Sequence, residues 1–260
     1  MKFKDQIGHT IILKETPKRI ISLVPSQSEF LWDIGLRKEL VGITKFCIHP
    51  DEMYRSIERV GGTKDLNIEK IRALKPDLII GNKEENDEVQ IKLLQKEFNV
   101  WMSDIITINN AIEMMQSLGL VLEKESQVAP LLIEVESSIS SIKNLFPSKT
   151  VAYFMWNEPF MLAANKTFIN SIIEHMGLKN VVEEKERYPM VTNDELINLN
   201  PNYCFLSSEP FPFKQKHMEE LKNILPNSKI ILVDGEMFSW YGSRLKLLEN
   251  YVYLLHKELS

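Results

Sequence analysis

Short apolar runs alternate along the chain with longer segments of helical periodicity. The runs predict seven buried strands, at residues 20–24, 40–44, 77–81, 100–103, 150–156, 203–207 and 230–234. Apolar spacing predicts helices between them, among others at residues 68–74, 87–98 and 109–122. Strands that alternate with helices are typical of parallel βαβ units, so the expected fold class is α/β.

The segment after the first strand predicts a helix with a capped start. Ser26 and Glu29 have the Ser-x-x-Glu spacing of a capping box, so the helix is expected to begin at Ser26 and to end near Gly35. A serine between a strand and a helix also occurs in nucleophile turns. Residues 24–28 (VPSQS) contain none of the glycines that such turns use, so a capping serine is the preferred interpretation.

The alternation stops between residues 124 and 146, where apolar residues recur at helical spacing. This predicts one helix of about 20 residues, roughly 30 Å long. Pro130 suits a first helical turn, so the regular part is expected to begin near Ala129. The sequence therefore predicts two α/β lobes with parallel sheets, residues 1–122 and 147–260, joined by one long helix within residues 123–146.

A weak internal repeat supports two related lobes. Residues 74–81 (LKPDLIIG) resemble residues 199–206 (LNPNYCFL), each with a helix end, a proline and a buried strand. Extending the match without gaps pairs Glu84 with Glu209. Each lobe would then carry an acidic residue just beyond the carboxyl end of the same strand.

Composition narrows the class of protein. The chain has 260 residues, 44% of them hydrophobic, and a net charge of −5 without a basic block, so nucleic acid is not an expected partner. The first ten residues (MKFKDQIGHT) lack the apolar centre of a signal peptide, and no apolar run is long enough to span a membrane. As written, the chain is expected to be soluble and cytoplasmic; if it is trimmed, it is expected to be periplasmic.

Catalytic and metal-binding motifs are missing from the sequence. There is no glycine-rich phosphate loop, no G-x-S-x-G and no H-E-x-x-H. Cys47 and His49 form only a pair, whereas a zinc site needs three or four protein ligands, and Glu158 and Asp234 remain as distant partners. No catalytic residue, intrinsic metal or cofactor is therefore expected. The alternative is an intracellular protein or enzyme that handles a metal or metal cofactor through Cys47 and His49.

Aromatic and polar residues follow the predicted strands, in the loops where open parallel sheets bind ligands. They include Phe46 after the second strand, Trp156 at the end of the fifth, and Tyr188 in a later loop. Residues 238–241 place three aromatic side chains in four positions. A flat ligand surface is favoured over core packing for Trp240 and Tyr241, while Phe238 fits either.

Four stretches resemble the substrate-binding proteins of vitamin B12 and iron-siderophore ABC importers, the class with a helical backbone between lobes. They are residues 18–29 (KRIISLVPSQSE), 60–63 (VGGT), 74–80 (LKPDLII) and 234–244 (DGEMFSWYGSR). The resemblance runs from about Asp5 to the last helix and is strongest for the cobalamin-binding branch. It implies two Rossmann-like lobes with a rigid linking helix and a shallow cleft, no catalysis, and a corrinoid or ferric chelate as ligand.

The resemblance also implies roles for particular residues. Expected ligand contacts are Phe46, Cys47, His49, Lys64, Trp156, Tyr188, Trp240, Tyr241 and Arg244. Lys64 and Arg244 would meet peripheral polar groups, and His49 could reach the ligand's own metal. An ABC permease would be met through one acidic residue of each lobe. Glu88 is preferred over Glu84 and Glu85 in the first lobe; Glu209 is preferred in the second, with Glu219 and Glu220 as alternatives.

Overall fold

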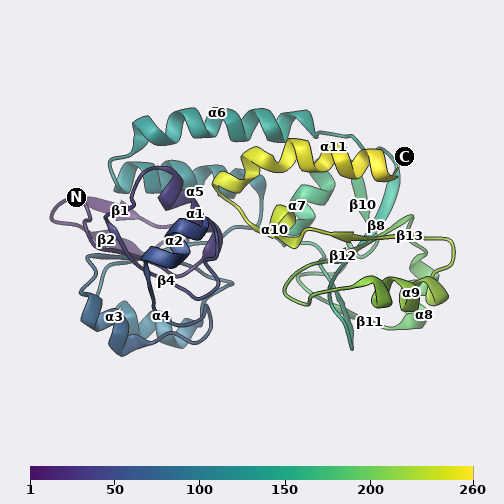
Figure 1. Ribbon diagram of the computed structural model, residues 1–260, viewed down its shortest axis with the longest axis horizontal. Coiled ribbons are helices and arrows are strands. Elements are labelled where there is room, and N and C mark those ends of the chain that lie inside the picture. Colours follow the sequence, from purple (N-terminus) through teal and green to yellow (C-terminus); the bar gives the residue numbers. More distant parts are fainter. Residues whose placement is uncertain (260) are drawn as a thin grey trace. The chain divides into compact units, whose positions relative to one another are not determined.

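The computed structural model describes residues 1–259, and the last residue of the predicted C-terminal lobe, Ser260, lies outside them (Figure 1). The chain forms two compact units. Unit 1 comprises Met1–Ile105, Asn109–Val135 and Tyr241–Arg244. Unit 2 comprises Ile106–Ile108, Glu136–Trp240 and the chain from Leu245 onward. Tyr241–Arg244, which the sequence assigned to the C-terminal lobe, thus belongs to unit 1.

Unit 1 is built on a five-stranded parallel sheet with the strand order β5-β4-β3-β6-β7. The strands are β3 (Ile20–Ser22), β4 (Leu40–Ile43), β5 (Glu58–Arg59), β6 (Leu78–Asn82) and β7 (Val100–Ser103). The chain leaves β3 toward one edge and returns on its other side as β6. The switch point of this sheet, where open α/β sheets bind ligands, therefore lies between β3 and β6.

Helices and a hairpin complete unit 1. The helices are α1 (Pro25–Asp33), α2 (Asp51–Ser56), α3 (Ile68–Leu74), α4 (Glu88–Leu94) and most of α5 (Ile108–Val121). The hairpin consists of β1 (Lys2–Lys4) and β2 (Thr10–Ile12). The hairpin lies beside the edge strand β7. The Met102 N–H donates to the Asp5 carboxylate, and the Gln6 N–H donates to the Met102 carbonyl. The core of the sheet is aliphatic, with Ile21, Ile71, Ile79 and Val100 among its members.

Unit 2 contains a six-stranded mixed sheet. The strands are β8 (Lys149–Trp156), β9 (Phe160–Leu162), β10 (Leu178–Asn180), β11 (Met190–Val191), β12 (Tyr203–Ser207) and β13 (Lys229–Val233). β8 is parallel to β10 and to β12, and β12 is parallel to β13. β9 and β11 add an antiparallel edge that the sequence did not predict. The helices are α7 (Phe168–His175), α8 (Asn193–Leu199), α9 (Gln215–Ile224), α10 (Gly235–Ser239), the 3₁₀ helix η1 (Ser243–Leu247) and α11 (Leu248–Leu259).

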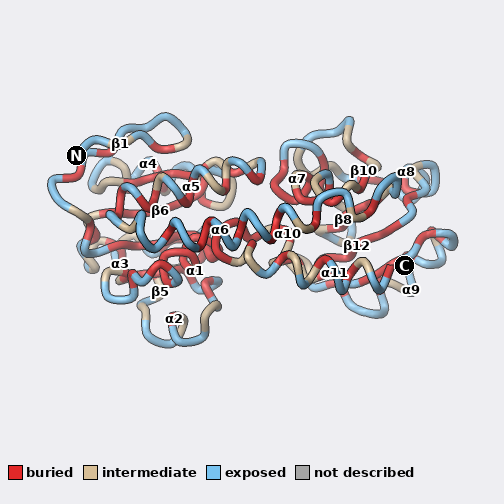
Figure 2. Tube along the Cα trace, turned by 90° about the horizontal axis from the view of Figure 1, so that it is seen from above, coloured by how far each residue is buried: buried red, intermediate tan, exposed pale blue. Residues whose placement is uncertain are grey.

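The predicted long helix exists as α6 (Glu125–Ser141), which begins in unit 1 and ends in unit 2. Figure 2 shows buried and exposed residues alternating along it, and Val128, Val135 and Ile139 are on its buried face. The expected start near Ala129 was wrong. The helix begins four residues earlier and includes Pro130, which lies on the exposed side and lacks the N–H that would bond back to the preceding turn.

The expected capping box at α1 was also wrong. The N-cap is Val24, without a side-chain hydrogen bond, and Pro25 is the first helical residue. Proline suits this position because its fixed φ is helical and its missing N–H has no helical partner there. Ser26 lies buried within the first turn, and Glu29 instead bonds to Arg244.

The internal repeat has matching local structure in both units. Lys75 follows α3 with φ 48°, and Asn200 follows α8 with φ 41°, both left-handed. Two residues later, the Asp77 carboxylate accepts the backbone N–H of Arg19, and the Asn202 amide oxygen accepts that of Thr150. Each acceptor therefore joins the start of one strand to the start of its parallel neighbour.

Candidate functional site

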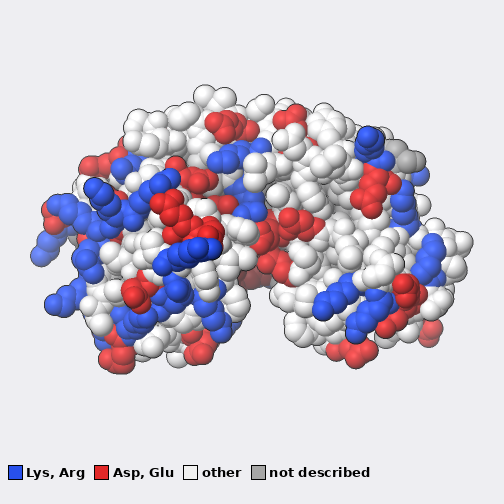
Figure 3. Space-filling model, in the orientation of Figure 1, with Lys and Arg blue, Asp and Glu red and all other residues white. Residues whose placement is uncertain are grey.

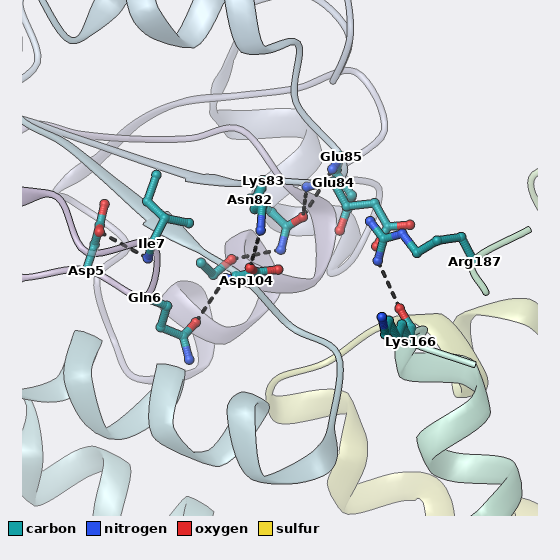
Figure 4. Close-up of polar contacts among 11 residues, drawn as sticks. Asp5, Gln6, Ile7, Asn82, Lys83, Glu84, Glu85, Asp104, Lys166 and Arg187 are labelled. Carbon is teal, nitrogen blue, oxygen red and sulfur yellow. Dashed lines mark hydrogen bonds and ion pairs between the residues drawn. The ribbon is translucent and has the colours of Figure 1, made fainter. Parts of the chain in front are cut away.

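The loop after β6, residues 83–87, is called the acidic loop (Figure 4). The Asn82 side-chain oxygen accepts the backbone N–H groups of Glu84 and Glu85 at 2.8 and 3.1 Å. Lys83 pairs with Asp104 beyond β7 at 2.6 Å. Asn86 is buried and donates to the carbonyls of Leu23 and Thr63, next to the switch point. The loop is thus held in one conformation by its own polar side chains.

Lys64, a predicted ligand contact, binds the acidic loop. Its ammonium group donates to the carbonyl of Glu84 at 2.5 Å and to that of Asn86 at 3.2 Å. The side chain is exposed, but its donors are directed at backbone oxygens. In this arrangement Lys64 positions the loop that carries Glu84 and Glu85.

Cys47 lies in the loop after β4 and is fully buried. Its Sγ is 3.1 Å from Ser28 Oγ and 3.1 Å from Thr44 Oγ1. Burial raises the pKa of the Cys47 thiol despite these hydrogen bonds. The thiol is therefore protonated near neutral pH and shielded from solvent, which suits neither a nucleophile nor a metal ligand.

Phe46 and His49 lie on the solvent side of the same loop. Half of the Phe46 surface is exposed, and His49 is half-buried. The Phe46 ring packs beside Gly62, where a Cβ would lie 3.3 Å from the ring, and the Lys45 ammonium sits 5.2 Å from its centroid.

Tyr241 and Arg244 bind unit 1 through two carboxylates. The Tyr241 hydroxyl donates to Glu85 Oε1 at 2.7 Å, and burial raises the pKa of this tyrosine well above its ordinary value. The Arg244 guanidinium donates to both oxygens of Glu29 at 2.8 and 2.9 Å. Both side chains, predicted as ligand contacts, are mostly buried, and their polar groups bond to carboxylates of unit 1.

In unit 2, aromatic side chains gather at the last residue of β8 and in the loop after β12. Trp156 is 42% exposed, and its ring meets that of Phe211 edge to face with centroids 5.6 Å apart. Phe211 in turn packs on Phe213, and Tyr188 is half-buried in the loop before β11. Phe211 was missed in the sequence because residues 210–212 (PFP) resemble an ordinary turn.

The remaining aromatic residues of unit 2 face inward. Phe238 is fully buried between Tyr153 and Phe205, so it belongs to the core. Trp240 is 6% exposed, and its indole N–H donates to Glu209 Oε1 at 3.1 Å. Burial raises the pKa of Glu209, although Ser239 and Trp240 donate hydrogen bonds to it.

The predicted docking carboxylates therefore differ in their accessibility. Glu88 is exposed in the first turn of α4 and pairs with Lys92 at 2.6 Å. Glu84 is half-buried in the acidic loop. The Glu209 carboxylate is turned toward its own unit, so Glu88 and Glu84 are the better placed of the three for a partner.

Two wider searches of residues 1–259 bear on the class of site. No group of three or more His, Cys, Asp or Glu side chains is arranged to hold a metal ion. No helix in this range combines the length and apolar character needed to cross a membrane.

The model of the periplasmic binding protein family matches residues 20–224. The chain belongs to this family. The resemblance seen in the sequence is thereby confirmed. Among curated relatives of this periplasmic binding protein, an uncharacterized ABC transporter substrate-binding lipoprotein of Bacillus subtilis, YvrC, is 25% identical over 93% of the chain and 80% of its own length. A vitamin B12-binding protein of Vibrio campbellii is 24% identical over 73% of the chain and 70% of its own length.

Solved structures of other periplasmic binding proteins share the fold. The periplasmic heme-binding protein RhuT of Roseiflexus sp. RS-1 has a TM-score of 0.81 at 16% identity, covering 94% of this chain and 99% of RhuT. The vitamin B12 binding protein BtuF of Vibrio cholerae has a TM-score of 0.73 at 21% identity, covering 94% and 98%. The predicted fold class, two α/β lobes with a connecting helix, is confirmed.

Proposed function

We propose that the protein is the substrate-binding component of an ABC importer and captures a flat metal chelate of the corrinoid or heme type. Its family membership and its relatives support this role, because their names describe vitamin B12 binding, heme binding and ABC transport. The role places the protein beside a membrane-bound permease. It differs from the cytoplasmic location expected of the sequence as written.

One observation of this structure supports a flat ligand in particular: exposed aromatic rings at the carboxyl ends of the strands. Phe46 follows β4 in unit 1, and Trp156 is the last residue of β8 in unit 2, each with about half its surface in solvent. Binding of a planar apolar molecule over such aromatic surfaces is favourable, because it removes their apolar area from water. Strand ends are also where α/β sheets bind ligands.

The proposed ligand contacts are Phe46, His49, Trp156 and Tyr188, with Phe211 added as the ring that supports Trp156. We propose that Lys64, Tyr241, Arg244 and Trp240 act one step away from the ligand, by holding loops in place. Cys47 fills the core beneath the loop of Phe46 and His49. A metal in the site would arrive within the ligand, and the imidazole of His49 has the chemistry to bind it.

The permease is proposed to bind the acidic residues of unit 1, Glu88 first and Glu84 second. Arginine or lysine side chains of a permease would pair with these carboxylates, which mainly sets orientation and association rate. The acidic loop is suited to this because its hydrogen bonds fix its shape before a partner arrives.

The proposal is tested by mixing the purified protein with cyanocobalamin, haemin or ferric citrate and measuring co-eluting colour and spectral shift. We expect one of these to be retained, and Trp156→Ala to weaken binding about tenfold or more through lost apolar contact. Tyr253→Ala is the matched control, since Tyr253 on α11 is 46% exposed but lies away from the strand ends.

The competing metal-handling role for Cys47 and His49 makes a different prediction. Stoichiometric zinc or iron in the purified protein, lost in both Cys47→Ala and His49→Ala, would overturn the binding-protein proposal. So would equal binding of the coloured ligand by Trp156→Ala and Tyr253→Ala.

A further inference from the structure

Exposed basic side chains gather at the amino ends of the parallel strands of unit 1 and on the adjoining hairpin. We call this group, which lies within the described residues, the basic end. It consists of Lys2, Lys14, Lys18, Arg19, Lys38 and Lys75. Figure 3 shows Lys and Arg crowding the side of the molecule where Figure 1 places the N-terminus, β1 and β2.

Hydrogen bonds hold much of the basic end together. The Arg19 guanidinium donates to the carbonyl of Leu74 at 2.6 and 2.9 Å, which places it beside Lys75. The backbone N–H groups of Lys18 and Arg19 donate to the Asp77 carboxylate at 2.8 to 3.1 Å. Asp77 is thus satisfied by backbone groups, and the charged ends of the basic side chains stay at the surface.

The hairpin adds to the same surface. Lys2 on β1 lies directly opposite Ile12 on β2, and the Ile12 N–H donates to the side chain of Asn99, just before β7. Lys14 follows two residues after Ile12. The open end of the hairpin therefore lies at the amino end of the sheet.

The basic end has a surplus of positive charge in a chain whose net charge is −5. Glu15, Glu39 and Asp77 lie close to these cations along the chain, and Glu15 is an exposed partner of Lys18 at 3.6 Å. The loop after β6 at the other end of the sheet instead carries four carboxylates, those of Glu84, Glu85, Asp87 and Glu88, beside Lys83.

An apolar side chain stands within this basic surface. Ile12 is 66% exposed and is flanked by Lys2 across the hairpin and by Lys14 along the chain. Basic residues around an exposed aliphatic side chain fit the boundary between lipid headgroups and acyl chains. A nucleic acid backbone would use the charges but has no role for the isoleucine.

From the charge and from Ile12, we infer that the basic end binds the anionic surface of a lipid bilayer. The inference rests on the proposed function, because the binding protein of an importer works next to a membrane. Each Lys or Arg near an anionic surface strengthens binding roughly fivefold. β6 has five residues, so the basic end and the acidic loop lie on the order of 16 Å apart. The surface that holds the protein at the bilayer is thus separate from the proposed docking surface.

The experiment is co-sedimentation of the purified full chain with vesicles of phosphatidylglycerol and phosphatidylcholine, or of phosphatidylcholine alone. We expect binding to the anionic vesicles only, and a fall when the salt concentration rises from 50 to 500 mM. Lys2→Gln/Lys14→Gln/Lys18→Gln is expected to weaken this binding at least tenfold. The matched control Lys179→Gln/Lys185→Gln/Lys216→Gln removes three exposed lysines of unit 2 and is expected to stay within twofold of the unaltered chain.

Three results would overturn the inference: equal binding to both kinds of vesicle, equal loss in the two triple variants, or binding to heparin or DNA without binding to anionic vesicles. The assay contains no chelate. Retention of cyanocobalamin or haemin by the same variants reports separately on the proposed function.

Discussion

At the scale of single residues, Glu209 shows how a buried carboxylate differs from a surface one. It lies at the carboxyl end of β12, accepts hydrogen bonds from Ser239 and Trp240, and has its pKa raised by burial. Between the unfolded pKa and this higher folded pKa, the folded chain binds more protons than the unfolded chain. The contribution of Glu209 to stability is therefore complete below the unfolded value and is lost as pH rises through the folded pKa.

Glu209→Gln is predicted to stabilise the protein at pH 8 and to have little effect near pH 4. The glutamine oxygen can still accept from Ser239 and Trp240, and the cost of burying a charge is removed. A gain of about 1 kcal/mol corresponds to a rise in Tm of roughly 2–4 °C for a chain of this size. Thermal melts of both proteins across this pH range check it, with exposed Glu220→Gln as the control. An equal shift at both pH values would contradict the assignment of the effect to ionisation.

At the scale of elements, the two left-handed helix ends offer a matched comparison. Lysine has a Cβ and no special tolerance for φ 48°, whereas asparagine adopts this region more readily. Lys75→Gly is predicted to raise the free energy of unfolding by about 1 kcal/mol, and Asn200→Gly by less. Urea unfolding of the two variants measures the difference. A larger gain at position 200 would show that backbone strain is not what separates the two caps.

Several strands and helices were predictable because their apolar residues are consecutive or recur at helical spacing. Val100–Ser103, Tyr203–Ser207 and Ile68–Leu74 have the predicted bounds to the residue. β9 and β11 were not found, because three and two residues are too few to establish an alternating pattern. The strands β1 and β2 of the hairpin have three residues each, and their polar residues resemble those of a loop.

The candidate site was predictable only in part, for a different reason. Sequence places an aromatic residue beyond a strand but does not show what it faces. Tyr241 bonds to Glu85, 156 residues away, and Arg244 bonds to Glu29, 215 residues away. No local pattern encodes partners at such separations, so these two residues resembled Phe46 and Trp156 although their partners lie within the chain.

At the scale of the whole molecule, the path of the chain links the stability of the two units. α6 is shared by both, and Tyr241–Arg244 is part of unit 1 while its neighbours along the chain are part of unit 2. Loosening this short segment therefore affects unit 1 directly and releases the end of α10 and the rest of η1, which leads into α11.

Arg244→Met is predicted to lower the free energy of unfolding by about 3 kcal/mol, because it leaves the mostly buried Glu29 carboxylate without its cation. Calorimetry should show one transition moved to lower temperature, with hydrogen exchange faster in β3, β6 and α11 together. Adding Glu29→Gln to this variant should recover most of the loss. Two separate transitions, with unit 2 unchanged, would contradict the linkage.

The place of Tyr241–Arg244 in unit 1 also sets an order of events during synthesis. Unit 1 is synthesised first but cannot be completed until Tyr241–Arg244 have been added. Until then Glu29 lacks its bond to Arg244, and Glu85 lacks its bond to Tyr241. More than one hundred residues separate Val135 from Tyr241, which at ribosomal speeds is a delay on the order of 5–20 s. Throughout that interval the N-terminal half stays incomplete, with two carboxylates lacking their partners, and remains the part of the nascent chain most easily kept unfolded.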